Sequence, residues 1–298
     1  MNAGTSACVA CSATPLHRMA DIGLSTLDRC RSCGLVVNHP RGPSQARDYY
    51  GDEYDGFYDH YYRVFRQRQF KDVVGRLAGV DFPSRRALDI GCSYGWFLQA
   101  ALAGGFDAVG AEPSSRVFHH LKATTALDVH HCGIDGVGAI DGRFGLITLW
   151  NVFEHLPDPA AALAQVADKL EPNGVLLLCV PDVTGLITRL SFLAHTLSMG
   201  RLKSHLLKMY QMDNDFPHLY HYSRHSLELV LRRHGFEPFE SWGQDIVDAA
   251  NMGQRIAGYE GIRTPGKWLL AKAVGAVQGA GTLLGLQDER VVLARRTR

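Results

Sequence analysis

The sequence lacks a strong excess of either charge and lacks any long run of purely apolar residues. Its 298 residues include 31 basic and 30 acidic side chains, which leaves a formal net charge of +1. This balance gives no signal for bulk attraction to nucleic acids or to membranes. The longest weakly polar stretch, residues 268–286, contains Lys272, Gln278 and several glycines. We therefore expect no membrane-spanning segment.

The chain also lacks the features of a secretory signal. Residues 1–5 contain neither the basic segment nor the apolar segment that such a signal needs. The expected location is therefore the cytoplasm, where the seven cysteines would act as metal ligands or stay free thiols rather than form disulfides. Hydrophobic residues make up 46% of the chain, and the length suits one large domain or one domain with an appendage.

Four of the seven cysteines form two C-x-x-C pairs near the N-terminus. Cys8 and Cys11 are separated from Cys30 and Cys33 by 18 residues, the spacing of a four-thiolate zinc ribbon. Four thiolates leave no open position for water, so the zinc would be structural. The alternative is four reduced cysteines without a metal. We predict a zinc ribbon over residues 1–45 with these four ligands.

Residues 46–82 are predicted to connect this ribbon to the main domain. The segment from Tyr49 to Tyr62 is dense in tyrosine, which suits either the entrance of a binding site or the packing of a connecting segment. Residues 63–77 follow with an approximate helical spacing of apolar residues. We therefore predict a tyrosine-rich linker followed by a helix.

From residue 83 onward, apolar runs of strand length alternate with helix-compatible segments, which predicts an α/β fold with a doubly wound parallel sheet. After Pro181 the alternation breaks. A basic and mostly helical stretch, residues 186–212, is predicted as part of a cap inserted at about 184–222, over the carboxyl ends of the strands. A helix is expected over 265–286. The predicted strands are 87–90, 106–111, 129–132, 144–150, 175–180, 236–242 and 291–294.

The loop after the first of these strands is the candidate cofactor site. The loop reads Gly91-x-Ser93-x-Gly95. It therefore does not match the G-x-G-x-x-G fingerprint of dinucleotide sites, because no third glycine stands in register. Asp89 precedes the loop and is placed to help hold a charged methionine end, as in S-adenosylmethionine. Glu112 ends the next strand, where its carboxylate suits two ribose hydroxyls. Glu112 would bind the ribose of NAD equally well. The prediction of S-adenosylmethionine therefore rests on the loop spacing and on Asp89.

Several segments resemble the motifs of class I methyltransferases that depend on S-adenosylmethionine, in the small-molecule branch that includes ubiquinone-type and natural-product enzymes. The family usually has an aspartate at the position of Gly145, which is not a catalytic position in the family. The resemblance covers residues 83–242, and an N-terminal zinc ribbon goes with one bacterial subgroup. The matching segments are 88–95 (LDIGCSYG), 109–114 (VGAEPS), 144–159 (FGLITLWNVFEHLPDP), 170–175 (LEPNGV) and 218–223 (HLYHYS).

The resemblance implies a Rossmann-like sheet of seven strands, with an antiparallel last strand between the fifth and the sixth. It implies that the first loop contacts the methionine part, that Glu112 binds the ribose, and that the segment around Cys132 and Ile134 faces the adenine. Asn151 would face the sulfonium. The implied cofactor residues are Asp89, Gly91, Cys92, Ser93, Gly95, Glu112, Pro113, Gly133, Ile134 and Asn151.

The expected activity is transfer of a methyl group to a small-molecule acceptor, such as a sugar nucleotide or a natural-product intermediate. A base is needed only where the acceptor must lose a proton, and His155, His218 and His221 are the candidates. One alternative is a protein whose ribbon grips RNA or protein, although the ribbon arginines are scattered and give no strong nucleic-acid signal. Another alternative is a dinucleotide oxidoreductase.

Overall fold

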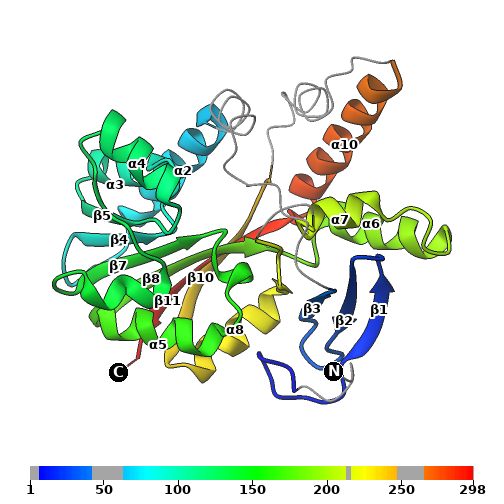
Figure 1. The fold of residues 1–298 in the computed structure, drawn as a ribbon, viewed down its shortest axis with the longest axis horizontal. Helices are drawn as coiled ribbons and strands as arrows, with labels where there is room; N and C mark the ends of the chain where they lie inside the picture. Colours follow the sequence, from blue (N-terminus) through cyan, green and yellow to red (C-terminus); the bar gives the residue numbers. More distant parts are fainter. Residues whose placement is uncertain (1–6, 42–62, 213–215, 247–264, 298) are drawn as a thin grey trace. The chain divides into compact units, whose positions relative to one another are not determined.

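The computed structural model describes residues 7–41, 63–212, 216–246 and 265–297 (Figure 1). The tyrosine-rich segment 49–62 lies outside these residues. The chain divides into two compact units. The ribbon unit comprises Met1–Phe57, Val180–Val230 and Trp242–Arg290, and the sheet unit comprises Tyr58–Cys179, Leu231–Ser241 and Val291–Arg298. Among the described residues, no helix is long and apolar enough to cross a membrane.

The sheet unit is built on a sheet of seven strands in the order β10-β11-β8-β7-β4-β5-β6. Strands β4 to β8 pair in parallel. The last strand of the chain, β11, lies between β8 and β10, which confirms the predicted Rossmann-like topology. The strands are β4 (Arg86–Ile90), β5 (Asp107–Ala111), β6 (Asp128–His130), β7 (Phe144–Trp150), β8 (Leu170–Pro181), β10 (Phe236–Gln244) and β11 (Glu289–Arg296).

Helices cover both faces of this sheet, as Figure 1 shows for α2, α3 and α4 on one face and α5 on the other. All residues of β7 are buried, as expected for a central strand. Phe70 of α2 and Phe97 of α3 pack their rings against Trp150, the last residue of β7. The helices are α2 (Arg63–Leu77), α3 (Trp96–Ala103), α4 (Ser115–Thr124), α5 (Pro159–Lys169) and α8 (Arg224–Arg233).

Two helix starts follow from capping side chains. The carboxylate of Asp158 accepts hydrogen bonds from the backbone N–H groups of Ala160 and Ala161, both at 3.0 Å, and Pro159 is the first residue of α5. The hydroxyl of Ser114 accepts from the backbone of Val117 at the start of α4. Each cap satisfies backbone donors that a helix leaves unpaired at its N-terminus.

Strand β8 differs from the prediction because it begins before the expected turn at residues 171–174. Leu170 already pairs with Phe144, and the register shifts before Leu146 pairs with Val175. The turn residues are therefore accommodated as an irregularity within one strand. At the same place, a Cβ on Gly145 would lie 2.1 Å from the carbonyl oxygen of Ser84. This close backbone approach explains why glycine replaces the aspartate usual in the family.

The ribbon unit contains a sheet of four strands in the order β1-β2-β3-β9. Strands β1 (His17–Asp21), β2 (Ser25–Arg29) and β3 (Val36–Pro40) come from the N-terminal region, whereas β9 (Tyr220–His221) comes from far along the chain. β9 pairs with β3 in an antiparallel arrangement. The N-terminal strands thus share one sheet with the segment around residue 220.

The segment predicted as one long helical stretch, 186–212, forms two helices, α6 (Leu186–Leu197) and α7 (Ser204–Met209). Met199 and Gly200 both have positive φ and separate them. Both helices pack on the ribbon strands in one buried cluster. Its members are Ala20, Ile22, Leu27, Val36, Val183, Phe192, Leu206, Tyr210 and Met212. The unit also contains α10 (Pro265–Leu283). That the cap covers the carboxyl ends of the sheet strands stays a prediction.

Candidate functional site

The loop after β4 is held in a tight conformation by residues with positive φ. Gly91, Ser93 and Gly95 have φ angles of 74°, 47° and 71°. A Cβ on Gly91 would lie 2.5 Å from Cγ2 of Val152, and one on Gly95 would lie 2.4 Å from Cδ1 of Leu127. Both the left-handed conformation and the close neighbours therefore favour glycine at these two positions. That this loop binds a ligand through its backbone stays a prediction.

Glu112 joins this loop to the end of β5. The side chain is 1% exposed. One carboxylate oxygen accepts the backbone N–H of Ser93 at 2.9 Å, and the other accepts the backbone N–H of Ser114 at 2.8 Å. Burial raises the pKa of this carboxyl, and these two hydrogen bonds oppose the rise. Each oxygen has a second lone pair, so the carboxylate is able to accept two ligand hydroxyls.

Asp89 is buried near the end of β4, and the hydroxyl of Thr148 donates to its carboxylate at 2.5 Å. Burial raises the pKa of Asp89 to about 7, the hydrogen bond from Thr148 opposes this, and the negative charge of Glu112 adds to it. The two buried acids thus create a site that a positively charged group would stabilise.

The predicted adenine side lies beyond the ends of β5 and β6. Gly133 precedes the short helix η2 (Ile134–Ala139), and a Cβ on Gly133 would lie 3.7 Å from Cβ of Pro113. The two segments that carry these predicted residues are therefore neighbours. Cys92 is different, because its Sγ is buried against Gly110, where a Cβ would lie 2.7 Å away. Cys92 therefore packs its side chain into the sheet, and burial raises its thiol pKa.

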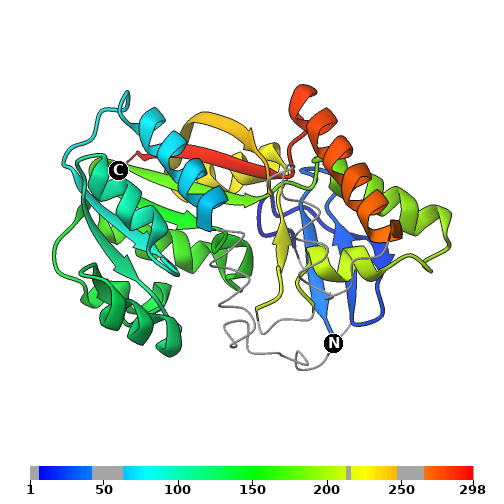
Figure 2. The same ribbon diagram turned by 90° about the horizontal axis from the view of Figure 1, so that it is seen from above.

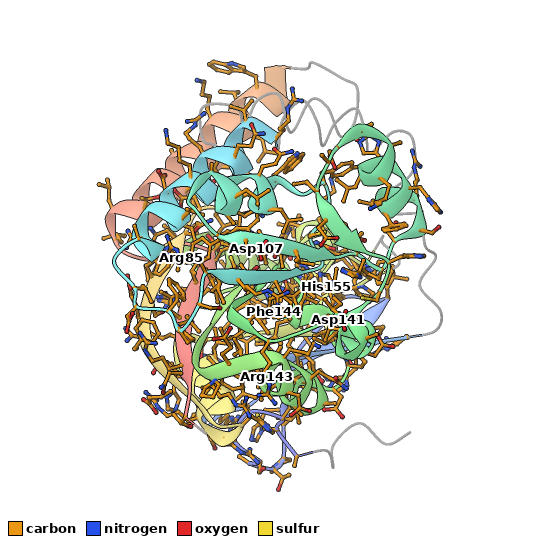
Figure 3. All side chains as sticks on the ribbon, turned by 90° about the vertical axis from the view of Figure 1, so that its left-hand side faces the viewer. Arg85, Asp107, Asp141, Arg143, Phe144 and His155 are labelled. Atoms are coloured by element: carbon orange, nitrogen blue, oxygen red, sulfur yellow. The ribbon has the colours of Figure 1, made fainter. Side chains whose placement is uncertain are left out.

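The carboxyl end of β7 brings the side chains of Asn151 and Arg66 together. Asn151 has φ 53°, and its backbone N–H donates to Cys179 at 2.9 Å. Its side-chain oxygen accepts from the guanidinium of Arg66 at 3.1 Å. Arg66 comes from α2 and is almost fully buried. His155 ends the short helix η3 (Phe153–His155), and Figure 3 labels it together with Phe144, which begins β7.

The other two candidate bases, His218 and His221, lie buried in the ribbon unit. Nδ1 of His218 and Nε2 of His221 are 3.1 Å apart and share a hydrogen bond. The ring of His221 stacks on Tyr210 with 4.0 Å between centroids. The carbonyl of His218 accepts the side-chain amide of Asn38 at 2.8 Å. These contacts give both histidines a place in the packing of that unit.

The four predicted metal ligands gather at one point of the ribbon unit. The Sγ atoms of Cys8, Cys11, Cys30 and Cys33 all lie within 4.8 Å of one another. The pairs Cys8–Cys33 and Cys11–Cys30 are each 3.5 Å apart. Sulfurs on a tetrahedral zinc ion at 2.3 Å would be separated by about 3.8 Å. The cluster therefore has the size and the donor chemistry of a four-thiolate zinc site.

A family model described as a methyltransferase domain matches residues 61–241, more than half of the chain. The chain belongs to this family. The predicted resemblance to class I methyltransferases that depend on S-adenosylmethionine is thereby confirmed.

Curated relatives agree with this family. The methyltransferase domain is 30% identical over 109 residues to a ubiquinone biosynthesis O-methyltransferase from Aromatoleum aromaticum, covering 35% of this chain and 46% of the relative. It is 28% identical over 107 residues to the protein of that name from Xanthomonas campestris pv. campestris, covering 34% and 45%. The chain thus spans less than half the length of the curated relatives it matches.

Solved structures support the same fold. A cyclopropane synthase from Mycobacterium tuberculosis aligns with a TM-score of 0.52 at 21% identity, covering 76% of this chain and 82% of that chain. A methyltransferase dependent on S-adenosylmethionine from Archaeoglobus fulgidus aligns with a TM-score of 0.51 at 16% identity, covering 82% and 100%. At these identities the likeness shows a shared fold.

Sequence reasoning did not identify Arg66 as the partner of Asn151. Its position in the buried stripe of α2 is a signal that was available, because Arg66, Gln69, Phe70 and Val73 follow helical spacing and are all buried. A buried arginine in such a stripe needs polar partners, and Gln69 and Asn151 accept its hydrogen bonds. Asn151, the first residue after β7, is thus paired with a cation from α2, 85 residues earlier in the chain.

The ligand-free methyltransferase is expected to lose stability as the pH rises toward 7, and Asp89→Asn is expected to reduce that loss. The pKa of Asp89 lies near 7 in the folded chain, against about 3.9 in an unfolded chain. Between these values the folded chain binds a proton that the unfolded chain releases, so the free energy of unfolding falls with rising pH, by at most about 4 kcal/mol.

Urea unfolding between pH 5 and pH 8 measures this slope. Asn keeps an oxygen for the Thr148 hydroxyl but does not titrate, so the slope should become shallower. The control is Asp107→Asn, at an exposed residue of β5, which should keep the wild-type slope. Equal slopes in Asp89→Asn and wild type would show that Asp89 is ionised in the folded chain at these pH values.

Proposed function

We propose that the protein transfers the methyl group of S-adenosylmethionine to a small-molecule acceptor, a sugar nucleotide or another biosynthetic intermediate. The hydrogen bond from the Ser93 backbone to Glu112 carries this proposal. It brings the glycine loop and a buried carboxylate to one place, and each oxygen of that carboxylate is still able to accept a hydroxyl. A nucleoside with a charged amino-acid tail requires such a carboxylate for its ribose hydroxyls and a loop whose backbone is able to contact its tail.

The chain's charged groups suit the two ends of such a ligand. The Arg66 guanidinium, held by Asn151, is a cation suited to a carboxylate. Asp89 and Glu112 provide the negative field that suits an ammonium group and a sulfonium. Glu112 would accept the ribose hydroxyls, and Pro113, Gly133 and Ile134 would form the wall along the base. These roles use Asp89, Glu112, Pro113, Gly133 and Ile134 from the residues predicted from the sequence, and they add Arg66.

When bound, S-adenosylmethionine supplies a methyl group already activated by a positive sulfur. The protein's main task is then to hold the acceptor atom in line with that methyl carbon. Where the acceptor carries a proton, a base must remove it. We assign this role to His155, because it follows β7 on the same short segment as Asn151. His218 and His221 stay the other candidates for this role.

A small-molecule acceptor is favoured over a nucleic acid by the charges of the ribbon. Arg18 forms an ion pair with Asp28 at 2.5 Å, and Arg41 forms one with Asp21 at 2.7 Å. These partners neutralise two of the few cations that a nucleic acid would contact. The curated relatives named for ubiquinone biosynthesis point in the same direction.

We further propose that the ribbon holds one structural Zn²⁺ on Cys8, Cys11, Cys30 and Cys33. The sulfur distances fit a tetrahedral ion, and all four positions would be filled by thiolates. Zinc would therefore stabilise the ribbon rather than take part in methyl transfer.

Isothermal titration calorimetry tests the proposed cofactor. We expect S-adenosylmethionine and its demethylated product to bind with one site per chain, and we expect no heat from NAD. The glycine spacing and Asp89 suit a methionine tail rather than a pyrophosphate. Binding of NAD without binding of S-adenosylmethionine would instead support an oxidoreductase and would overturn the proposal.

A further inference from the structure

The ribbon unit exposes an unusual amount of apolar side chain on α6 and α10. Among the described residues, fifteen large apolar side chains are exposed. Five of them lie in 190–202 and five in 268–284. Soluble surfaces rarely gather apolar side chains in this way without a partner. We call the exposed apolar side chains of these two segments the α6–α10 surface.

On α6 the exposed side chains form one stripe. Leu190, Leu193 and Leu197 follow helical spacing, and the last two are 52% and 75% exposed. Phe192, on another face, is buried in the cluster that joins α6 to the ribbon strands. One face of the helix is therefore buried against the ribbon strands, and a second apolar face is exposed. Met199 extends this face into the following turn.

α10 provides the second part of the surface and packs against α6 (Figures 1 and 2). The backbone N–H of Leu186 donates to the carbonyl of Leu286 at 2.8 Å, which links the start of α6 to the residues after α10. Trp268 is 60% exposed, and its neighbours Leu269 and Leu270 are exposed as well. An exposed tryptophan is typical of surfaces that meet the headgroup region of a bilayer.

Cations outnumber acids around this surface, although the carboxylate of Asp245 accepts a hydrogen bond from the hydroxyl of Thr282 in α10. Residues 183–212 and 265–287 contain no aspartate or glutamate. The cations Arg189, Arg201 and Lys203 are exposed, and the ammonium of Lys272 lies 5.7 Å from the ring of Trp268. The near-zero net charge of the whole chain hides this local excess of cations.

The excess of positive charge decides between two possible partners of this surface, a second copy of the chain and a membrane. A second copy of the chain would bring the same cations against one another, which opposes association. An anionic bilayer offers both an apolar layer for the leucines and phosphates for the cations. We propose that the α6–α10 surface binds the interface of a membrane containing anionic phospholipid. This proposal is independent of the proposed methyl transfer.

Co-sedimentation with vesicles tests the proposal on the full chain. We expect binding to vesicles of phosphatidylglycerol and phosphatidylcholine in equal amounts, weaker binding at high salt, and no binding to phosphatidylcholine alone. The double variant Leu193→Glu/Leu197→Glu should bind the anionic vesicles about ten-fold more weakly or worse, because it places charges where apolar contact is needed. Trp268→Glu should weaken binding through α10.

The matched control is Leu102→Glu, at a leucine of α3 that is 44% exposed outside this surface, and it should bind vesicles like the wild type. Calorimetry with S-adenosylmethionine keeps the two proposals apart, because the double variant should retain its cofactor binding. The proposal is overturned if the wild type does not bind anionic vesicles or if the double variant binds them as strongly as the wild type. A dimer in sedimentation velocity that the double variant abolishes would also overturn it, by assigning the surface to a second copy.

Discussion

Glu112→Gln is expected to weaken the binding of S-adenosylmethionine about a hundred-fold. Hydrogen bonds to a charged acceptor contribute about 1.5–3 kcal/mol each, and 2.7 kcal/mol corresponds to about a hundred-fold in affinity. Both carboxylate oxygens already accept a backbone N–H, from Ser93 and Ser114. The glutamine amide nitrogen would face a donor on one side and a ribose hydroxyl on the other, so one half of the site would lose its acceptor.

Calorimetry measures the affinity, and thermal unfolding separates the loss of a ligand contact from the loss of the fold. The control is Asp107→Asn, at the first residue of the same strand β5, where the side chain is exposed. That variant should bind the cofactor like the wild type. An unchanged affinity in a folded Glu112→Gln protein would remove Glu112 from the binding site.

Cys30→Ser is expected to release zinc and to unfold much of the ribbon. Binding to four thiolates contributes about 10–16 kcal/mol in small zinc domains, and that free energy is also their folding free energy. Serine is a poor zinc ligand, and Cys30 is buried within the four-sulfur cluster. α6 and α7 pack against β1, β2 and β3 in one buried cluster. Unfolding of these strands should therefore destabilise the whole ribbon unit.

Zinc content by elemental analysis should fall from one per chain toward zero in Cys30→Ser. The matched control is Cys132→Ser, which changes a cysteine outside the cluster and should keep full zinc content. Protease sensitivity of the N-terminal strands should rise only in Cys30→Ser. Full zinc content in that variant would refute the assignment of the cluster.

The features that the sequence predicted well depend on short-range signals. The central strand β7 has the predicted bounds because an uninterrupted apolar run must be buried on both faces. Helix α5 starts at Pro159 because the local signals of Asp158 and Pro159 act within one turn. The class of fold follows from the regular alternation of such elements. The loop after β4 and Glu112 are neighbours because each follows or ends a strand, and adjacent parallel strands end at the same edge.

Other features arise from contacts between distant parts of the chain, which no local pattern reports. Turn residues before Val175 became part of β8 because Leu170 pairs with Phe144. Asn151 gained the cation Arg66 from a helix 85 residues earlier. Gly145 is required by the approach of the Ser84 backbone.

The resemblance of short motifs identified the methyltransferase domain, and cysteine spacing indicated the four-cysteine cluster, because these signals lie within single elements or in adjacent strands. The partners of the ribbon depended on the folded chain. Strand β9 joins β3, and Phe192 and Tyr210 share one buried cluster with Leu27, because apolar surfaces are buried wherever they meet in space. The same packing leaves Leu193 and Leu197 on the outside, and so creates a surface that the overall charge of the sequence did not indicate.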